Sequence, residues 1–231
     1  MYPILFEVWG VRIYSFGMMS AIGFLIAFVL LLRSNRRKGF HPESMSDPAF
    51  GLFISGLVGA RALFILLNWE QFQDNPLPMV QFQKGGLVAY GGVFLAILFA
   101  VLFTRFKSIP FWESADLIAP FGILAVAFGR IGCFLNGCCY GRPSRFFGTH
   151  PAQLYESALL FLLFIGLMIA DRRPLKAGRL FGLTLGGYAL LRFGVEFFRG
   201  DQIPILLNLT LVQWMSLASL LVAALIWRVR R

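Results

Sequence analysis

Residues 115–134 read ADLIAPFGILAVAFGRIGCF, an almost entirely apolar run that carries one arginine, Arg130, near its end. A helix of this length, rising 1.5 Å per residue, crosses a hydrocarbon core of roughly 30 Å. An ionisable group at membrane depth is costly, so Arg130 is a functional candidate. The chain continues as LNGCCYG to Gly141. The stretch therefore predicts a membrane helix with a functional site at its end.

Composition extends this prediction to the whole chain. Hydrophobic residues make up 58% and charged residues only 14%, which leaves too little polar surface for a soluble protein. We expect an all-α polytopic membrane protein with about seven transmembrane helices in a single domain, residues 1–231. No signal-peptide cleavage pattern precedes the first helix, so we expect it to be retained. The predicted spans are residues 14–32, 49–67, 87–103, 115–134, 152–170, 180–198 and 209–227.

The basic residues of the connections predict the orientation. One set of helix ends holds 13 of the 21 Lys and Arg residues, and the opposite set holds five, namely Arg12, Lys84, Arg142, Arg145 and Arg199. Because cytoplasmic loops are enriched in basic residues, we expect the N-terminus outside and the C-terminus in the cytoplasm. The net charge of +10 then reflects topology and contact with lipid head groups. No basic soluble face is present to indicate nucleic-acid binding.

Three arginines, Arg61, Arg130 and Arg192, fall inside predicted spans, and all three fall in the outer half of the bilayer. Each costs about 2.5 to 3.5 kcal/mol on insertion scales, so each needs a partner or a ligand. Two carboxylates, Glu156 and Glu196, are expected at the same depth.

Tyr188, Arg192 and Glu196 are spaced by four residues and share one helical face. One interpretation is a salt bridge that only neutralises the arginine. The other is an anion site, because the planar guanidinium suits phosphate oxygens and Arg61 and Arg130 have no obvious partner in sequence. In the outer leaflet the abundant anion is a phospholipid head group. His150, just before the fifth span, is a further substrate-binding candidate.

The segment from Lys84 to Gly92, KGGLVAYGG, opens the third span. Glycines around Tyr90 permit close backbone approach to a ligand and expose amide donors, so Gly91 and Gly92 are candidate binding residues. The alternative is tight packing of membrane helices, for which small residues are common.

The three cysteines, Cys133, Cys138 and Cys139, have no CxxC spacing. With only His41 and His150 as further soft ligands, no metal site is expected. Small residues at a packed helix end, a disulfide that leaves one thiol free, and a nucleophilic Cys paired with His150 all stay open.

Several motifs, in order, resemble the bacterial prolipoprotein diacylglyceryl transferases. They are Tyr14 followed by SFGMM, the glycine segment at Tyr90, ADLIAP from Ala115, the stretch 129–141, HPAQLYE from His150, and YALLRFGVEFFR from Tyr188. The resemblance implies a seven-span enzyme of the bacterial cytoplasmic (inner) membrane with its active site toward the outer leaflet. It implies transfer of the diacylglyceryl group of phosphatidylglycerol to the lipobox cysteine of a preprolipoprotein signal peptide, releasing glycerol phosphate, without a cofactor.

The resemblance also assigns roles to individual residues. Arg130 and Arg192 would hold the phosphate while Glu196 orients Arg192. The sequence departs from the family where Tyr90 replaces a histidine and where Cys133 and Cys138 replace Asn and Glu. The general base is therefore unassigned, with Tyr90 a catalytic candidate. The other family positions carried over are Tyr14, Asn136, Gly141 and Tyr188.

Two rival functions remain. A lipid or anion carrier would use the same arginines to bind a head group without cleaving it. A paralogous transferase would use a different acceptor, as the departures at Tyr90 and the cysteines suggest. Against the carrier, the chain lacks the duplicated halves of many transporters.

Overall fold

The structure, a computed structural model, describes residues 2–8, 11–37, 42–73, 77–80, 86–145 and 148–230. Lys84, Gly85 and His41 of the sequence analysis lie outside these residues. Helices dominate the described part, and each predicted span corresponds to one of them, which confirms the all-α fold. They are α1 (Ser15–Arg37), α2 (Pro42–Leu67), α3 (Ala89–Phe106), α4 (Phe111–Asn136), α5 (Ala152–Ala170), α6 (Arg179–Glu196) and α7 (Leu211–Val229).

Six of these helices are long and apolar enough to cross a membrane. The remaining one, α6, has 18 residues but includes Arg179, Arg192 and Glu196. These charges lower its hydropathy, although its length would still cross the hydrocarbon core when its polar face is turned inward. The chain is therefore a multi-pass membrane protein.

Three short hairpins, which the sequence did not predict, precede α1, join α4 to α5 and join α6 to α7. The pairs are antiparallel: β1 (Ile4–Val8) with β2 (Val11–Tyr14), β3 (Pro143–Ser144) with β4 (Gly148–Thr149), and β5 (Pro204–Leu206) with β6 (Leu209–Thr210). Leu207 and Asn208, between β5 and β6, have φ of 53° and 57°. Two successive left-handed residues form the tight turn that suits a two-residue hairpin loop. Two 3₁₀ turns, η1 (Trp69–Gln71) and η2 (Leu77–Val80), follow α2.

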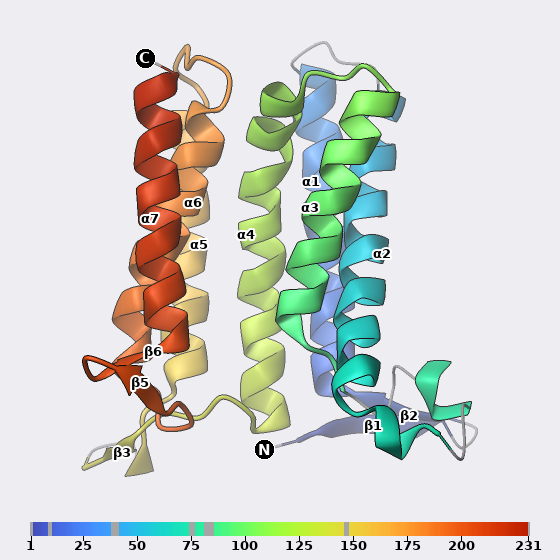
Figure 1. The fold of residues 1–231 in the computed structure, drawn as a ribbon, viewed down its shortest axis with the longest axis vertical. Coiled ribbons are helices and arrows are strands. Elements are labelled where there is room, and N and C mark those ends of the chain that lie inside the picture. Colours follow the sequence, from blue (N-terminus) through green and yellow to red (C-terminus); the bar gives the residue numbers. More distant parts are fainter. Residues whose placement is uncertain are drawn as a thin grey trace. The chain divides into compact units, whose positions relative to one another are not determined.

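The chain divides into two compact units, Met1–Leu31 with Ala115–Arg231, and Leu32–Ser114. In the first unit α6 packs against both α5 and α7, and these helices lie side by side in Figure 1. Its core is built by Ile123, Ala127, Leu160, Leu167 and Leu180. In the second unit α2 packs along α3.

Asp116, in the ADLIAP motif of α4, holds the start of α6. Its carboxylate accepts hydrogen bonds from the backbone N–H groups of Gly178 and Phe181, each at 2.6 Å. These are donors of the first helical turn, which have no partner within the helix. The negative charge also complements the positive end of the helix dipole.

Replacing Asp116 by alanine is therefore expected to destabilise the protein by about 1 to 2 kcal/mol, the usual effect of losing a charged cap. The measurement is the thermal unfolding midpoint of the purified protein in detergent. Glu113→Ala, at an exposed position on the same helix, serves as the control and should leave the midpoint unchanged. Equal midpoints for both variants would show that the cap contributes nothing.

Candidate active site

Charged side chains from three helices meet at one end of the first unit. Arg130 of α4 places Nε 3.0 Å from Oε1 of Glu156 on α5. Nη1 of Arg192 on α6 lies 3.6 Å from the other oxygen of Glu156 and 2.9 Å from Oε2 of Glu196. The structure brings these four residues together, whereas Arg61, which the sequence placed at the same depth, belongs to the second unit. Glu156 is the bridge between the two arginines.

The charges continue beyond the end of α6. Arg199 lies 4.0 Å from Glu196 and forms two hydrogen bonds to the carboxylate of Asp201, at 2.9 and 2.7 Å. The Thr210 hydroxyl donates to Oε1 of Glu196 at 2.9 Å, and the same hydroxyl caps α7 by accepting from the Gln213 N–H. We call these six residues the charge network: Arg130, Glu156, Arg192, Glu196, Arg199 and Asp201.

The charge network is buried and electrically balanced, with three arginines and three carboxylates. Glu156 and Glu196 are each 2% exposed and Arg192 is 6% exposed, so water screens little of their mutual attraction. Nη1 of Arg192, Oε1 of Glu156 and Oε2 of Glu196 lie at ion-pair distance but form no aligned hydrogen bond. The network thus neutralises its own charge within the protein, away from solvent.

Arg130 is the most accessible arginine of the three. Its side chain is 17% exposed, against 7% for Arg192 and Arg199. Within the described part of the chain its ion pair uses Nε, and neither terminal nitrogen has a protein hydrogen bond. A guanidinium anchored at Nε presents both terminal nitrogens as a fork, the arrangement that recognises phosphate oxygens.

The ion pair between Arg199 and Asp201 makes the stability of the fold depend on pH. Burial alone would raise the pKa of Asp201, but the hydrogen bonds and charge of Arg199 outweigh burial and lower that pKa. A carboxyl whose pKa is lower in the folded state stabilises the fold above its ordinary pKa. That contribution is lost as the pH falls through the lowered value.

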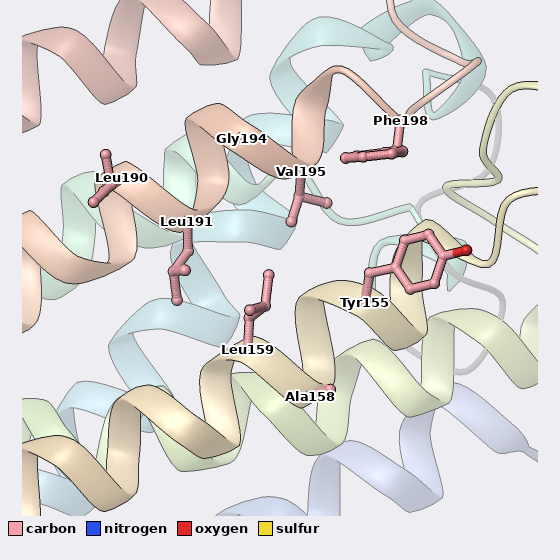
Figure 2. A pocket seen from close by; sticks show the side chains of 8 residues that line it. All are labelled: Tyr155, Ala158, Leu159, Leu190, Leu191, Gly194, Val195 and Phe198. Atoms are coloured by element: carbon pink, nitrogen blue, oxygen red, sulfur yellow. The ribbon is translucent and has the colours of Figure 1, made fainter.

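An apolar groove of about 510 Å³ runs between α5 and α6 beside the charge network. Figure 2 shows that Ala158 and Leu159 line it from α5, and that Leu191 and Val195 line it from α6. Tyr155 and Phe198 close one end, where the Tyr155 hydroxyl lies 3.3 Å from Nδ1 of His150. Glu156 follows Tyr155 directly in the chain, so the groove begins at the level of the charge network.

The segment between α4 and α5 is held against the end of α6. Gly141 pairs with Arg199 in an isolated bridge, and a Cβ at this position would lie 2.2 Å from the His150 carbonyl oxygen. Glycine is therefore required there for close backbone approach. Gln153 donates to the Cys138 carbonyl at 2.7 Å. The structure thus gives Gly141 a packing role and places His150 against Tyr155 and Phe198, the residues that close this end of the groove.

The other candidates of the first unit lie around the same end. Tyr14 ends β2 and pairs with Ile4, and Asn136 is the last residue of α4. Tyr188 packs against the apolar core, one turn before Arg192. In the described part of the chain no ion pair joins these three residues to the charge network.

Tyr90, Gly91 and Gly92 belong to the second unit. Tyr90 lies in the first turn of α3 with 44% of its surface exposed. A Cβ at Gly91 would lie 2.3 Å from the Gly59 carbonyl oxygen, and one at Gly92 would lie 2.7 Å from that of Gly56. Both glycines therefore let α3 approach α2, the helix-packing alternative considered in the sequence analysis.

Arg61, also in the second unit, fixes the chain after α2. Its Nε donates to the Met79 carbonyl at 3.0 Å, Nη1 donates to Gly86 at 2.9 Å, and Nη2 donates to Pro78. Its guanidinium also lies over the Phe64 and Phe72 rings, at 5.4 and 5.9 Å. Arg61 and Arg130, which have no obvious partner in the sequence, both have partners in the structure: Arg61 binds backbone carbonyls and Arg130 pairs with Glu156. For Arg61 the structure supports a structural role.

Arg61→Lys should therefore be poorly tolerated, because one ammonium cannot reach carbonyls on three sides. With two carbonyls left unsatisfied at about 1 to 3 kcal/mol each, we expect a loss of about 2 to 6 kcal/mol in unfolding free energy. Thermal unfolding in detergent measures the effect, with Arg105→Lys at the other end of α3 as the control. A wild-type midpoint for Arg61→Lys would contradict the role of the guanidinium.

Sequence reasoning underrated two residues of this site. Glu156 was placed at the right depth but not among the site residues, although it bridges two arginines. Arg199 was counted as a loop charge, yet it is 7% exposed and ion-paired. The sequence did hold a signal for Arg199. Asp201 follows it by two residues, so an ion pair between the two side chains could have been expected.

Helices enclosing buried arginines beside an apolar groove define a multi-pass membrane protein with a charged site inside its helices. A family profile described as prolipoprotein diacylglyceryl transferase matches residues 3–229. The chain belongs to this family, so it is an enzyme, a transferase of lipoprotein biosynthesis, as the resemblance implied.

Individual relatives match along nearly the whole chain. A phosphatidylglycerol–prolipoprotein diacylglyceryl transferase of Clostridium tetani is 32% identical, over 100% of this chain and 98% of its own length. Those of Trichormus variabilis and Bacillus licheniformis are 31% and 28% identical, over 97% and 99% of this chain and 89% and 92% of their own lengths.

Proposed function

We propose that the protein transfers the diacylglyceryl group of phosphatidylglycerol to the lipobox cysteine thiol of a preprolipoprotein signal peptide, forming a thioether and releasing glycerol phosphate. The single observation that carries the proposal is the guanidinium of Arg130, whose Nε lies 3.0 Å from Glu156 and whose side chain, 17% exposed, is the most accessible of the three arginines in the charge network. The names and full-length similarity of the relatives support the same substrates.

The charge network suits a phosphodiester that becomes a leaving group. Arg130 offers two donors, and Arg192 contributes positive charge from a position fixed by Glu156 and Glu196. Charge on the phosphate oxygens rises as the carbon–oxygen bond breaks, so preorganised donors stabilise the transition state more than the bound lipid. Glu196 orients Arg192 and does not touch the substrate.

The groove between α5 and α6 suits an acyl chain of the lipid. Its lining is apolar except for the Tyr155 hydroxyl at the end nearest the charge network. A head group at the network and a chain along the groove satisfy both parts of the lipid without burying an unpaired charge. His150, Tyr14, Asn136 and Tyr188 stay further substrate-binding candidates.

Transfer is an in-line displacement at carbon. The acceptor sulfur attacks the glyceryl carbon that carries the phosphate oxygen, and the electrons of the broken carbon–oxygen bond leave with the phosphate. Because no carbonyl is attacked, no oxyanion hole is needed. Alignment of sulfur, carbon and oxygen then supplies a large part of the rate.

The acceptor thiol has an ordinary pKa of about 8.5, so a nearby group must favour its deprotonation before it can react as a thiolate. We propose that the hydroxyl group of Tyr90, which stands where other members have a histidine, takes part in deprotonating this thiol. A phenol is a weak base at neutral pH, since its ordinary pKa is about 10. Tyr90 therefore contributes a hydrogen bond and part of the proton transfer.

Tyr90→Phe should lower the rate of transfer by roughly 10²-fold, the lower end of the effect of one positioned proton-transfer group. Tyr90→His should keep activity and move its pH dependence toward neutrality, because imidazole titrates near about 6.5. Rates of both variants between pH 6 and 9 are the measurement. A wild-type rate for Tyr90→Phe over this range would assign the ring to packing alone.

The proposed setting is the cytoplasmic membrane of a bacterium, with both units forming one transferase domain. The excess of basic residues at one set of helix ends supports a cytoplasmic C-terminus and an outward-facing charge network. Phosphatidylglycerol and the translocated signal peptide would then both be available in the outer leaflet.

Complementation tests the proposed function in cells. A bacterial strain depleted of its own diacylglyceryl transferase should recover growth and lipid-modified lipoproteins when it expresses this chain, but not when it expresses Arg130→Ala at equal abundance in the membrane. Growth without modified lipoproteins, or equal rescue by both proteins, would contradict the proposal.

A further inference from the structure

The three cysteines come together at the end of α4, although their spacing in the sequence gave no sign of it. Their sulfur atoms all lie within 4.8 Å of one another, and all three thiols are free. Cys133 is buried in the last turns of α4, and the two others follow the helix. No His, Asp or Glu among the described residues joins the group.

Local backbone geometry explains the convergence. Gly137 and Cys139 have left-handed φ angles of 81° and 61°, so the chain reverses sharply after α4. The Cys138 N–H donates to the Cys133 carbonyl at 3.2 Å, and the Cys138 thiol lies 3.6 Å from the same oxygen. A left-handed conformation is uncommon for a cysteine, and here it turns the third thiol back toward α4.

From this geometry we infer that Cys133, Cys138 and Cys139 bind one zinc ion, and that its open fourth position takes the acceptor thiol. Zinc binds thiolates at about 2.3 Å, which places tetrahedral ligands about 3.8 Å apart, so rotamer adjustments of roughly 1 Å complete the site. Catalytic zinc sites use three protein ligands and leave the fourth position to substrate. The inference rests on the proposed function.

The cysteines lie beside Arg130, so a thiol bound at the fourth position of the zinc ion would lie close to the lipid. Cys133 follows Arg130 by three residues on α4, so the two side chains are neighbours on one face of the helix. A sulfur held at the zinc ion is therefore next to the guanidinium proposed to hold the lipid phosphate. Zinc keeps a coordinated thiol deprotonated, which supplies the activation that the missing histidine does not.

The step balances without a further reactant. The acceptor thiol gives its proton to water on binding, and its sulfur then forms a bond to the glyceryl carbon as the carbon–oxygen bond breaks. Glycerol phosphate leaves with the bonding electrons. The product thioether is a neutral sulfur and a weaker ligand than a thiolate, so it leaves the zinc ion and frees the site for the next acceptor.

Cobalt substitution tests the site without relying on catalysis. The reduced, purified full chain titrated with Co²⁺ alone should bind one ion per chain with intense sulfur-to-cobalt charge-transfer absorption. Adding a lipobox peptide without lipid should increase this absorption, whereas the same peptide with serine in place of cysteine should not. Cys139→Ser and Cys138→Ala, which each remove one thiolate ligand, should both lose binding while keeping the unfolding midpoint of the metal-free wild type.

Zinc removal is the second arm. A chelator should lower the rate of diacylglyceryl transfer by roughly 10²-fold, and Zn²⁺ should restore it, if the ion supplies thiol activation. Absence of bound cobalt, a disulfide between two of the cysteines, or cobalt spectra indifferent to the cysteine peptide would overturn the inference, whatever the transfer assay shows. If cobalt and peptide bind as expected but no lipid is transferred, the proposed function fails and the thiol-binding metal site stands.

Discussion

Arg130→Lys is expected to slow diacylglyceryl transfer by about 10² to 10³-fold, the usual effect of removing a donor that stabilises transition-state charge. Lysine can keep a contact to Glu156, now 3.0 Å from Nε, but then has no second nitrogen to direct at the phosphate. The measurement is the initial rate of glycerol phosphate release with purified variants in phosphatidylglycerol-containing micelles.

Two variants frame this result. Arg145→Lys, at an exposed position in the connection after α4, should match the wild type. Arg192→Lys should lose as much activity as Arg130→Lys and also lower the unfolding midpoint, because both Glu156 and Glu196 depend on Arg192. A wild-type rate for Arg130→Lys would show that a point charge suffices and that the fork has no role in catalysis.

Glu156→Gln is expected to destabilise the fold by about 3 to 5 kcal/mol, the usual effect of removing one partner from a buried ion pair. Glutamine keeps the shape of the side chain, which is 2% exposed, but leaves Arg130 and Arg192 adjacent without their shared counter-charge. The thermal unfolding midpoint in detergent and the yield of monodisperse protein measure this loss.

A double variant separates charge balance from packing. Combining Glu156→Gln with Arg130→Gln removes one charge of each sign, so the double variant should be more stable than Glu156→Gln alone. If the loss of stability in the double variant equals the sum of the losses in the two single variants, Glu156 acts through packing and not through its charge.

Much of the fold could be predicted because membrane helices are encoded by composition over whole windows. The apolar run that contains Arg130 and the six other apolar runs predicted all seven helices. Most of the predicted ends lie within a few residues of the ends in the structure. The contact between Arg192 and Glu196 also follows from sequence, since residues four apart on a helix are neighbours. The larger error at the start of α2, predicted at residue 49 and found at Pro42, arose because polar residues there continue the helix beyond the apolar run.

The partners of the arginines could not be predicted in the same way. The bridge from Glu156 to Arg130 joins α5 to α4, and helix–helix register is invisible in one sequence. The carbonyls that Arg61 binds belong to the short 3₁₀ turn η2 and to Gly86, where the sequence shows neither helix nor strand periodicity. The convergence of the cysteines depends on two left-handed residues, which no spacing rule for metal ligands anticipates.

The central claim is tested most directly with purified protein, phosphatidylglycerol and a lipobox peptide. We predict that the cysteine peptide gains the mass of one diacylglyceryl group for each glycerol phosphate released, and that a serine peptide gains none. A protein that binds the lipid but yields neither product would be a carrier. Glycerol phosphate release with no gain of mass on the cysteine peptide would also contradict the account, because the diacylglyceryl group would then pass to another acceptor.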